Sequence, residues 1–343
     1  PRIGKTKMII DLIKRDNIRG RIIWVTLTKK LAEENIPSEF VKWMAQEYLV
    51  ALEFVTWRSL HKVEGECRLL IGDEDQHMTA KNSVNLFKGK LKPEQIITMT
   101  GTESKSKSKL DLYRRLKLDI IHKISINDAV DIGLLANYKI NIVEVEMDTH
   151  KNVEVKFKDK KTKKEKSFKT SEASQYEYLS KRIDKHKTKF SLIHRRSIIG
   201  KSKSKVGAAK YIFNSLEGRR LIFTTNQEQA EEISQYYYHG GTDDVNLKKF
   251  INGDINKIAM VNKGGTGETY ETIDHLIMIQ IDSDTNGLTS QKIARTLLEQ
   301  GDYEATIWIL CLKGTQDEVW LQSVLSSFDM NKVEFINYKN LVL

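Results

Sequence analysis

Residues 67–75 read CRLLIGDED, an apolar run that ends in a cluster of acids. Such a run before Asp73 and Glu74 is typical of a buried strand whose carboxyl end carries polar side chains. RIIWVTL (21–27) and QIITMTG (95–101) have the same character, and helix-like patterns lie between these runs. Strand–helix alternation of this kind predicts an α/β fold with a doubly wound parallel sheet, in which ligands bind at the carboxyl ends of the strands.

The same alternation resumes in the second half of the chain. Its apolar runs are RLIFTTN (220–226), KIAMVN (257–262), HLIMIQI (275–281) and ATIWILCL (305–312). A chain of 343 residues is long enough for two such domains, each with its own core. We therefore predict a first domain over residues 1–148 and a second domain over residues 171–343.

The segment between these domains, residues 149–170, is dominated by lysine. Its alternating character on both sides of KDKKTKKEK fits a β-hairpin with a charged tip, and its charge also fits a flexible linker. A solvated surface segment and one that touches nucleic acid both remain open. Two Ser/Lys runs, SKSKSK (104–109) and KSKSK (201–205), are too short to count as repeats.

The composition restricts the class of protein. The formal net charge of +10 favours polyanionic partners, most often nucleic acid, although many basic proteins bind none. No apolar run approaches the ~20 residues that a membrane span needs, so we expect no membrane partner. Cys67 and Cys311 are the only cysteines, which excludes a disulfide framework and a cysteine-rich metal site. We expect a protein of the reducing cytoplasm.

Gly4-Lys5-Thr6 has the composition of the end of a phosphate-binding loop. In such loops glycine permits a close backbone approach, lysine reaches the β- and γ-phosphates of ATP, and threonine binds Mg²⁺. The apolar residues of the segment that follows have helical spacing, as this interpretation requires. The rest of the loop would precede Pro1, and because the chain does not begin with Met we expect a longer protein. A chance tripeptide is the alternative.

Two strand ends offer partners for this loop. Asp73 could bind Mg²⁺ and Glu74 could orient the attacking water, as paired acids do in phosphate-loop ATPases. Thr100-Gly101-Thr102 ends the next apolar run, where its hydroxyls could sense the γ-phosphate or contact the acidic pair. The alternatives are solvated loop acids and a simple turn.

Taken in order, the segments along nearly the whole chain resemble the motifs of superfamily 2 DExD/H-type ATP-dependent helicases. Nine segments match these motifs in order. They are PRIGKT (1–6) for motif I, VTLTKKLAEE (25–34) for motif Ia, TWRSL (56–60) for motif Ib, DEDQ (73–76) for motif II, TGT (100–102) for motif III, LIFTTNQEQAEEI (221–233) for motif IV, YYHGGT (237–242) for the histidine segment that follows, VNKGGTGETY (261–270) for motif V and SQKIARTLL (290–298) for motif VI. The resemblance is greatest to phage-like relatives of the branch-migration helicases and of restriction-enzyme motor subunits.

This resemblance implies two tandem RecA-like domains with ATP and Mg²⁺ in the cleft between them. The residues that it assigns to catalysis are Lys5, Asp73, Glu74, Gln291 and Arg295. Those assigned to ATP are Gly4, Lys5, Thr6, Gly265, Gly267 and Arg295, and those assigned to Mg²⁺ are Thr6 and Asp73. Coupling of the nucleotide to strand movement would fall to Gln76, His77, Thr100, Gly101, Thr102 and His239.

Nucleic acid would cross both domains and contact them through its backbone more than its bases. The resemblance assigns this contact to Thr28, Lys29, Lys30, Thr56, Arg58, Lys263 and Thr266. For the lysines an exposed helix start is the alternative. Trp24, Trp57 and Trp308 lie in strand-like contexts, so we expect them in the core and not beneath bases.

The last motif departs from the family pattern QRxGRxxR. Lys292 replaces its first arginine and Leu298 its last, which leaves Arg295 as the candidate arginine finger. The loss at Leu298 leaves open slow hydrolysis or an arginine from elsewhere, such as Arg195 or Arg196. In the second motif His77 follows Gln76, and a coupling role and an ordinary loop position are both open.

These features together predict an ATP-dependent helicase or translocase acting on nucleic acid, with DNA favoured over RNA. One alternative is the motor subunit of a restriction-type nuclease complex, and replication, recombination or nuclease proteins would then be partners. Another is a clamp that binds ATP and nucleic acid but hydrolyses slowly.

Overall fold

The computed structural model of the chain describes residues 4–29, 31–101, 106–158, 164–186, 188–261, 272–282, 288–297 and 303–343. The chain divides into two compact units. The first comprises Pro1–Ser125 with Thr285–Gln291, and the second comprises Ile126–Asp284 with Lys292–Leu343.

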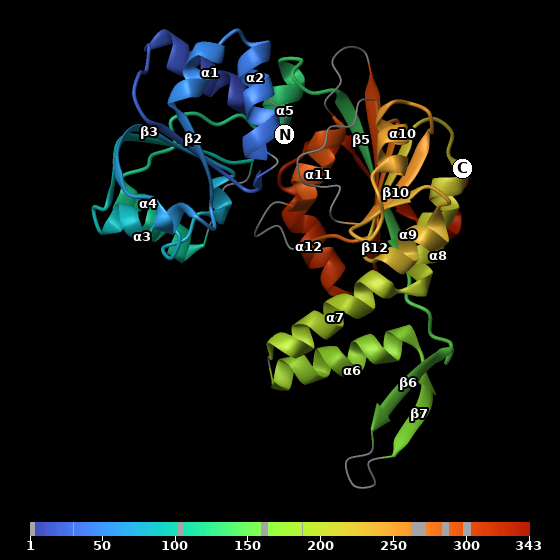
Figure 1. Cartoon of the computed structure of the whole chain (residues 1–343). Coiled ribbons are helices and arrows are strands. Elements are labelled where there is room, and N and C mark those ends of the chain that lie inside the picture. The colour runs from blue at the N-terminus through green and yellow to red at the C-terminus, as the bar shows by residue number, and fades with distance from the viewer. Residues whose placement is uncertain are drawn as a thin grey trace. The chain divides into compact units, whose positions relative to one another are not determined.

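The first unit is built on a four-stranded parallel sheet with the strand order β2-β1-β3-β4. Its strands are β1 (Ile22–Thr26), β2 (Leu52–Thr56), β3 (Gly65–Asp73) and β4 (Leu91–Met99). Its helices are α1 (Lys5–Arg15), the π-helical turn Leu31–Asn35, α2 (Ile36–Lys42), α3 (Val84–Phe87) and α4 (Lys107–Leu116). Figure 1 shows α1 and α2 on one side of this sheet and α3 and α4 on the other.

Alternation along β1 explains why this sheet is buried on both faces. Ile22 and Trp24 pack with α1 and α2, whereas Ile23 and Val25 belong to the core on the opposite side. Successive side chains of a strand point to opposite faces, so an unbroken apolar run requires cover on both. Trp24 and Trp57 of this unit, and Trp308 of the second, are at most 6% exposed. Their predicted core positions are confirmed.

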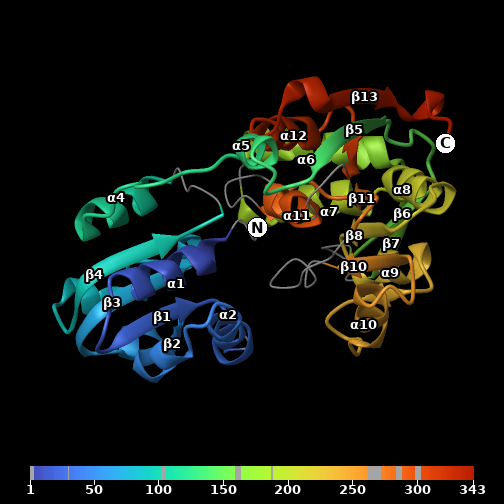
Figure 2. The same ribbon diagram turned by 90° about the horizontal axis from the view of Figure 1, so that it is seen from above.

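The second unit contains a seven-stranded parallel sheet with the order β13-β5-β12-β11-β8-β10-β9. Its strands are β5 (Asn137–Val145), β8 (Arg220–Thr224), β9 (Tyr237–Tyr238), β10 (Lys257–Val261), β11 (His275–Met278), β12 (Glu304–Leu312) and β13 (Val333–Asn337). Its helices are α5 (Ile126–Asp131), α6 (Glu172–Lys185), α7 (Lys189–Lys201), α8 (Lys203–Ser215), α9 (Gln227–Ile233), α10 (Val245–Ile251), the part of α11 (Leu288–Thr296) from Lys292 onward, and α12 (Gln316–Leu325). Figure 2 shows this sheet from above, with β13 and β5 at one edge.

The structure corrects the predicted domain boundary. Residues 137–145 were expected in a first domain that ends at 148, but as β5 they pair with β12 and β13 of the second sheet. The second unit accordingly begins at Ile126. Residues 149–170, for which a hairpin and a linker were both open, contain the antiparallel strands β6 (Val153–Lys158) and β7 (Glu165–Thr170).

Both cysteines are free and buried, Cys67 in β3 and Cys311 in β12. Burial is the largest influence on the Cys311 thiol and raises its pKa to about 12. The thiol is therefore protonated at neutral pH and unreactive. Among the described helices, none is both long and apolar enough to cross a membrane.

Candidate functional site

Gly4, Lys5 and Thr6 lie at the amino end of α1, as the sequence predicted. Gly4 precedes the helix with φ 79°, a left-handed conformation that is unfavourable for residues with a Cβ atom. The apolar side of α1 places Ile9, Ile10 and Ile13 in the core, which fixes the helix against the sheet. The amino end of α1 therefore has a fixed position, and the first N–H groups of a helix can bind an anion.

Lys5, the first residue of α1, contacts Glu74 of the acidic pair at the end of β3. Lys5 Nζ lies 3.0 Å from Glu74 Oε1, and the two side chains are 18% and 21% exposed. Glu74 has φ 51° and ψ 59°, a left-handed conformation that costs a residue other than glycine about 1–2 kcal/mol. Strain of this kind is concentrated at functional sites, where the surrounding structure holds it in place.

A chain of hydrogen bonds continues from Glu74 to the end of β4. Gln76 Nε2 donates to Glu74 Oε2 at 2.9 Å, and Thr100 Oγ1 donates to Gln76 Oε1 at 2.7 Å. The Gly101 N–H points at the same carboxylate from 3.5 Å. Three segments that are distant in sequence are thus joined in one network, and Gln76 links the two strand ends. Thr102, also expected here, is outside the described residues.

The two acids have opposite pKa shifts. Burial is the largest influence on the pKa of each acid, and for Asp73 it raises the pKa. For Glu74 this effect is outweighed by the charge of Lys5 and by hydrogen bonds from Gln76 and Lys5, which together bring its pKa to about 2. Glu74 is therefore ionised throughout the physiological pH range, whereas the charge of Lys5 offsets only part of the effect of burial on Asp73. A carboxylate whose charge is only partly compensated suits a hard divalent cation such as Mg²⁺.

Close packing beneath β3 fixes this strand end. A Cβ atom at Gly72 would lie 2.9 Å from Trp57 Cη2, so only glycine allows the indole to pack there. The Trp57 Nε1–H in turn donates to the Asp73 carbonyl at 2.7 Å. The small residue before the acids is thus explained by the tryptophan packed against it.

A lysine from α4 supports the turn that follows the acids, and sequence analysis missed it. The buried Lys109 ammonium donates to the carbonyls of Asp75 and Met78, the latter at 2.8 Å. Tyr113 Oη donates to Asp75 Oδ1 at 2.8 Å. Burial lowers the pKa of Lys109 to about 8, against a smaller raising effect of Asp75. Lys109 is the last residue of the SKSKSK run, and nothing in the sequence of that run indicates that one of its lysines is buried.

Lys109 gives a test through the pH dependence of stability. Between about pH 8 and 10.5 the unfolded lysine keeps a proton that the folded one has lost, so wild-type stability rises with pH. Relative to Lys109→Met, the free energy of unfolding of the wild type should rise by up to about 1.4 kcal/mol per pH unit in this window. Urea titrations of both proteins measure it. A difference independent of pH would show that Lys109 titrates normally.

The first-unit candidates for nucleic acid follow two neighbouring strands. β1 and β2 are parallel, with Thr26 opposite Thr56, so the residues after them lie at one edge of the sheet. Lys29 and Arg58 are exposed there, whereas Thr56 is part-buried. The carbonyl of Thr28 accepts a hydrogen bond from Thr26 Oγ1. Lys30 is outside the described residues.

His77 and His239, both expected to couple the nucleotide to movement, have different surroundings. His77 is exposed, and the partial burial that remains is the largest influence on its pKa, which is lowered. His239 is 6% exposed, lies 3.1 Å from Glu231, stacks on Tyr237 at 5.6 Å and accepts the Gly241 N–H. His239 is therefore held by contacts within the second unit.

Several second-unit candidates lie outside the described residues. They are Gly265, Gly267, Lys263, Thr266 and Leu298, together with the side chain of Arg295. Gln291 lies on α11 and is buried. Lys292, at the position of the family's first arginine, lies 3.7 Å from the buried Asp282.

The two alternative arginines on α7 are both engaged. Arg196 also contacts Asp282, and Arg195 donates to Gln316 Oε1 at 2.8 Å. Asp282 therefore binds two cations, Arg196 and Lys292, just beyond the carboxyl end of β11.

Known structures resemble this fold at low sequence identity. S. cerevisiae Dbp5 bound to RNA and ADP BeF3 matches with a TM-score of 0.58 and 10% identity, over 98% of this chain and 83% of that chain. The Pyrococcus furiosus Hef helicase domain matches with a TM-score of 0.52 and 14% identity, over 94% of this chain and 92% of that one. The chain shares the fold of these two structures. Its parallel-sheet units correspond to tandem RecA-like domains, which confirms the predicted fold class. The sequence itself matches no family model and no curated protein.

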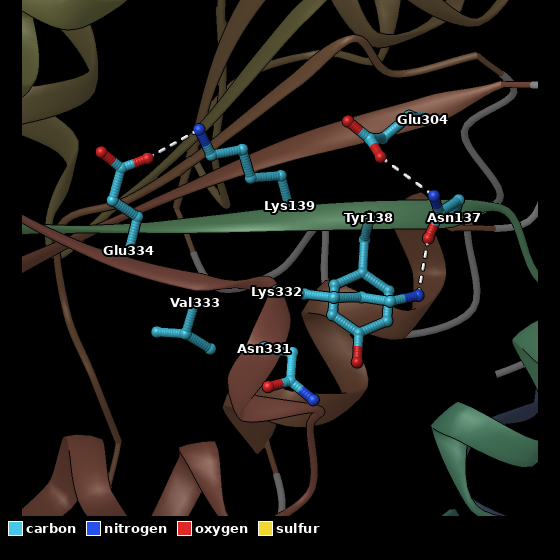
Figure 3. Close-up of a pocket in the computed structure, with 8 residues that line it drawn as sticks. All are labelled: Asn137, Tyr138, Lys139, Glu304, Asn331, Lys332, Val333 and Glu334. Atoms are coloured by element: carbon cyan, nitrogen blue, oxygen red, sulfur yellow. Dashed lines mark hydrogen bonds and ion pairs between the residues drawn. The ribbon is translucent and has the colours of Figure 1, made fainter.

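A pocket in the second unit is not the candidate site. It has a volume of about 300 Å³ and lies at the amino ends of β5, β12 and β13, away from the edge where parallel sheets bind ligands (Figure 3). Lys139 pairs with Glu334 at 2.7 Å, and the neutral Asn137 amide donates to Glu304 and accepts from Lys332. Each charged group drawn there thus has a polar partner in the lining of the pocket.

Proposed function

We propose that the protein is an ATP-dependent nucleic-acid helicase or translocase that acts on DNA in the cytoplasm. The network Lys5–Glu74–Gln76–Thr100 carries the proposal, because it joins a helix amino end to two strand ends. These are the segments that resemble motifs I, II and III of helicases. The fold shared with Dbp5 and the Hef helicase domain supports it independently of the motifs.

The side chains fit a magnesium nucleotide. Thr6 offers a hydroxyl and Asp73 a part-buried carboxylate, the hard oxygen ligands that Mg²⁺ accepts alongside phosphate and water. The described residues contain no group of three His, Cys, Asp or Glu side chains that could hold a metal, which agrees with an ion held by few protein ligands. When bound, ATP supplies the phosphoryl group, and Mg²⁺ neutralises its developing charge.

Lys5 and Glu74 would change partners during the cycle. In the described structure the Lys5 ammonium neutralises the Glu74 carboxylate at 3.0 Å. Movement of Lys5 onto a phosphate would free one carboxylate oxygen of Glu74 while Gln76 still holds the other. Glu74, ionised because its pKa is about 2, would then orient the attacking water. Arg295 is our candidate for the arginine that stabilises the transition state.

The nucleic-acid strand would pass over the exposed side chains Lys29 and Arg58, with Lys263 and Thr266 as counterparts from the second domain. DNA is favoured by the resemblance to branch-migration helicases and restriction-enzyme motors, whereas Dbp5 was solved with RNA. A role beside a separate nuclease or other recombination proteins is part of the same proposal.

One set of measurements tests the proposal. ATP hydrolysis and strand displacement are measured with single strands, forks and junctions of DNA and with RNA duplexes of the same sequence. We expect nucleic acid to raise the rate of hydrolysis at least ~10-fold, the scale of one catalytic contact. Larger stimulation by RNA would overturn the DNA assignment, and no stimulation by any substrate would overturn the motor itself.

One observation favours a second candidate, a clamp that binds ATP and nucleic acid but hydrolyses slowly. Lys292 lies against Asp282 and is 7% exposed, so its charge is committed within the second unit. Lys292 and Leu298 both stand where the family pattern of motif VI has arginine, so Arg295 is the one arginine left in that motif. Tight ATP binding with slow, unstimulated hydrolysis would identify the clamp.

A further inference from the structure

The hairpin β6–β7 forms a two-stranded sheet of its own within the described part of the chain. It follows β5 and leads into α6, and Figure 1 shows it as a separate ribbon. Six residue pairs set its register, from Val153 opposite Thr170 to Lys158 opposite Glu165. A two-stranded sheet is too narrow to bury a face of its own.

One face of this hairpin carries an apolar strip. Val153, Val155 and Phe157 alternate along β6, and Phe168 lies opposite Val155 on β7. The rings of Phe157 and Phe168 meet edge to face with centroids 6.0 Å apart. They are nevertheless 44% and 53% exposed, so each keeps a large part of its surface in contact with solvent.

The charge of the hairpin identifies the kind of partner that would cover these rings. Residues 151–170 contain nine lysines and three acids. Lys156 and Lys169 are exposed and lie on the face of the hairpin that does not carry the rings. Lys166 is the cross-strand partner of Phe157 and lies on the same face as the rings. A partner must therefore be strongly anionic and must also present flat apolar surfaces. Nucleic acid has both, in its phosphates and its unpaired bases.

We propose that the β6–β7 hairpin is a second nucleic-acid-binding element, which stacks unpaired bases at a duplex end on Phe157 and Phe168 while its lysines bind the backbone. The proposal rests on the proposed function, since it gives a motor a place to hold the junction between paired and unpaired strands. It adds a binding surface that none of the helicase-like motifs contains.

Two substitutions of the rings, made in the full chain, test the stacking. Phe157→Leu/Phe168→Leu keeps apolar side chains in the strip and removes only the rings, and Phe157→Tyr/Phe168→Tyr keeps the rings. Fluorescence anisotropy without ATP measures affinity for a fork and for a blunt duplex. We expect the leucine variant to bind the fork about 5- to 100-fold more weakly, with little change for the duplex, and the tyrosine variant to match the wild type.

The lysines are tested through the salt dependence of the same binding. Lys156→Gln/Lys169→Gln should reduce the slope of log affinity against log salt by about 1–2, since each phosphate contact contributes about 0.7–0.9.

Phe335→Ala is the control for the ring substitutions. It removes a phenylalanine of similar exposure from the edge strand β13 and should leave the affinity for the fork and for the duplex unchanged.

Each result decides the matter. Unchanged fork affinity in the leucine variant would overturn the proposal, and a loss of self-association with unchanged fork affinity would assign the strip to protein contact instead. If the wild type shows stimulated hydrolysis but the variants bind normally, only the hairpin proposal fails. If hydrolysis is never stimulated but fork binding depends on the rings, the motor proposal fails and the hairpin proposal stands.

Discussion

Replacing Lys5 with alanine or Glu74 with glutamine is expected to lower nucleic-acid-stimulated ATP hydrolysis by about 10²–10⁴-fold, the usual contribution of one positioned acid–base group. The two changes act differently. Lys5→Ala removes the cation at the start of α1 and should weaken ATP binding as well as hydrolysis. Glu74→Gln is isosteric but has a single acceptor oxygen, which can keep the bond from Lys5 or the bond from Gln76. Because Lys5 itself is retained, this variant should leave ATP binding nearly unchanged.

Hydrolysis is followed by phosphate release and ATP binding with a fluorescent analogue. Lys7→Ala is the matched control, because Lys7 lies on the same helix, pairs with exposed Asp11 at 2.5 Å and lies over the Trp43 ring at 5.0 Å. It should retain the wild-type rate. Full hydrolysis by both variants would refute the assignment of the network to ATP chemistry. Equal loss of binding and hydrolysis in Glu74→Gln would give Glu74 a structural role.

Much of the fold is local enough for the sequence to predict. β1 is buried throughout because both faces of the sheet are covered, and its limits agree with the predicted run to within a residue or two. β5, by contrast, was assigned to the wrong side of the boundary. Its sequence NYKINIVEV describes a strand but not its neighbours, and only pairing with β12, more than 150 residues away, places it in the second sheet.

The candidate site divides in the same way. Lys5, Glu74 and Thr100 were predicted because each follows or precedes a periodic segment, and the structure joins them through Gln76 in one network. Lys109 was missed, because nothing in a run of serines and lysines tells which lysine is buried.

The same limit applies to Lys205, the last residue of KSKSK (201–205). It lies on α8, and its ammonium donates to Asp317 Oδ2 at the start of α12, with both side chains 0% exposed. Asp317 Oδ2 also accepts the Leu312 N–H at 3.2 Å. Both Ser/Lys runs of the chain thus end in a buried lysine, each held by oxygen atoms from distant segments.

Lys205→Met is expected to destabilise the protein by about 3–5 kcal/mol, because it leaves the Asp317 carboxylate buried without a counter-charge. The double variant Lys205→Met/Asp317→Asn should recover at least half of this loss. It removes both charges and keeps an oxygen for the Leu312 N–H, and replacing a buried ion pair as a whole is often close to neutral. Urea unfolding, followed by tryptophan fluorescence, measures the three proteins.

Lys210→Met supplies the control on the same helix. Lys210 lies 3.7 Å from Glu232, but its side chain is 44% exposed and that of Glu232 60%, so solvent screens the pair and the cost should stay below about 1 kcal/mol. Equal losses in Lys205→Met and Lys210→Met would show that burial of the ion pair has no energetic consequence. A double variant as unstable as Lys205→Met would trace the loss to packing around α8 and not to the unpaired carboxylate, since its charge would then be absent.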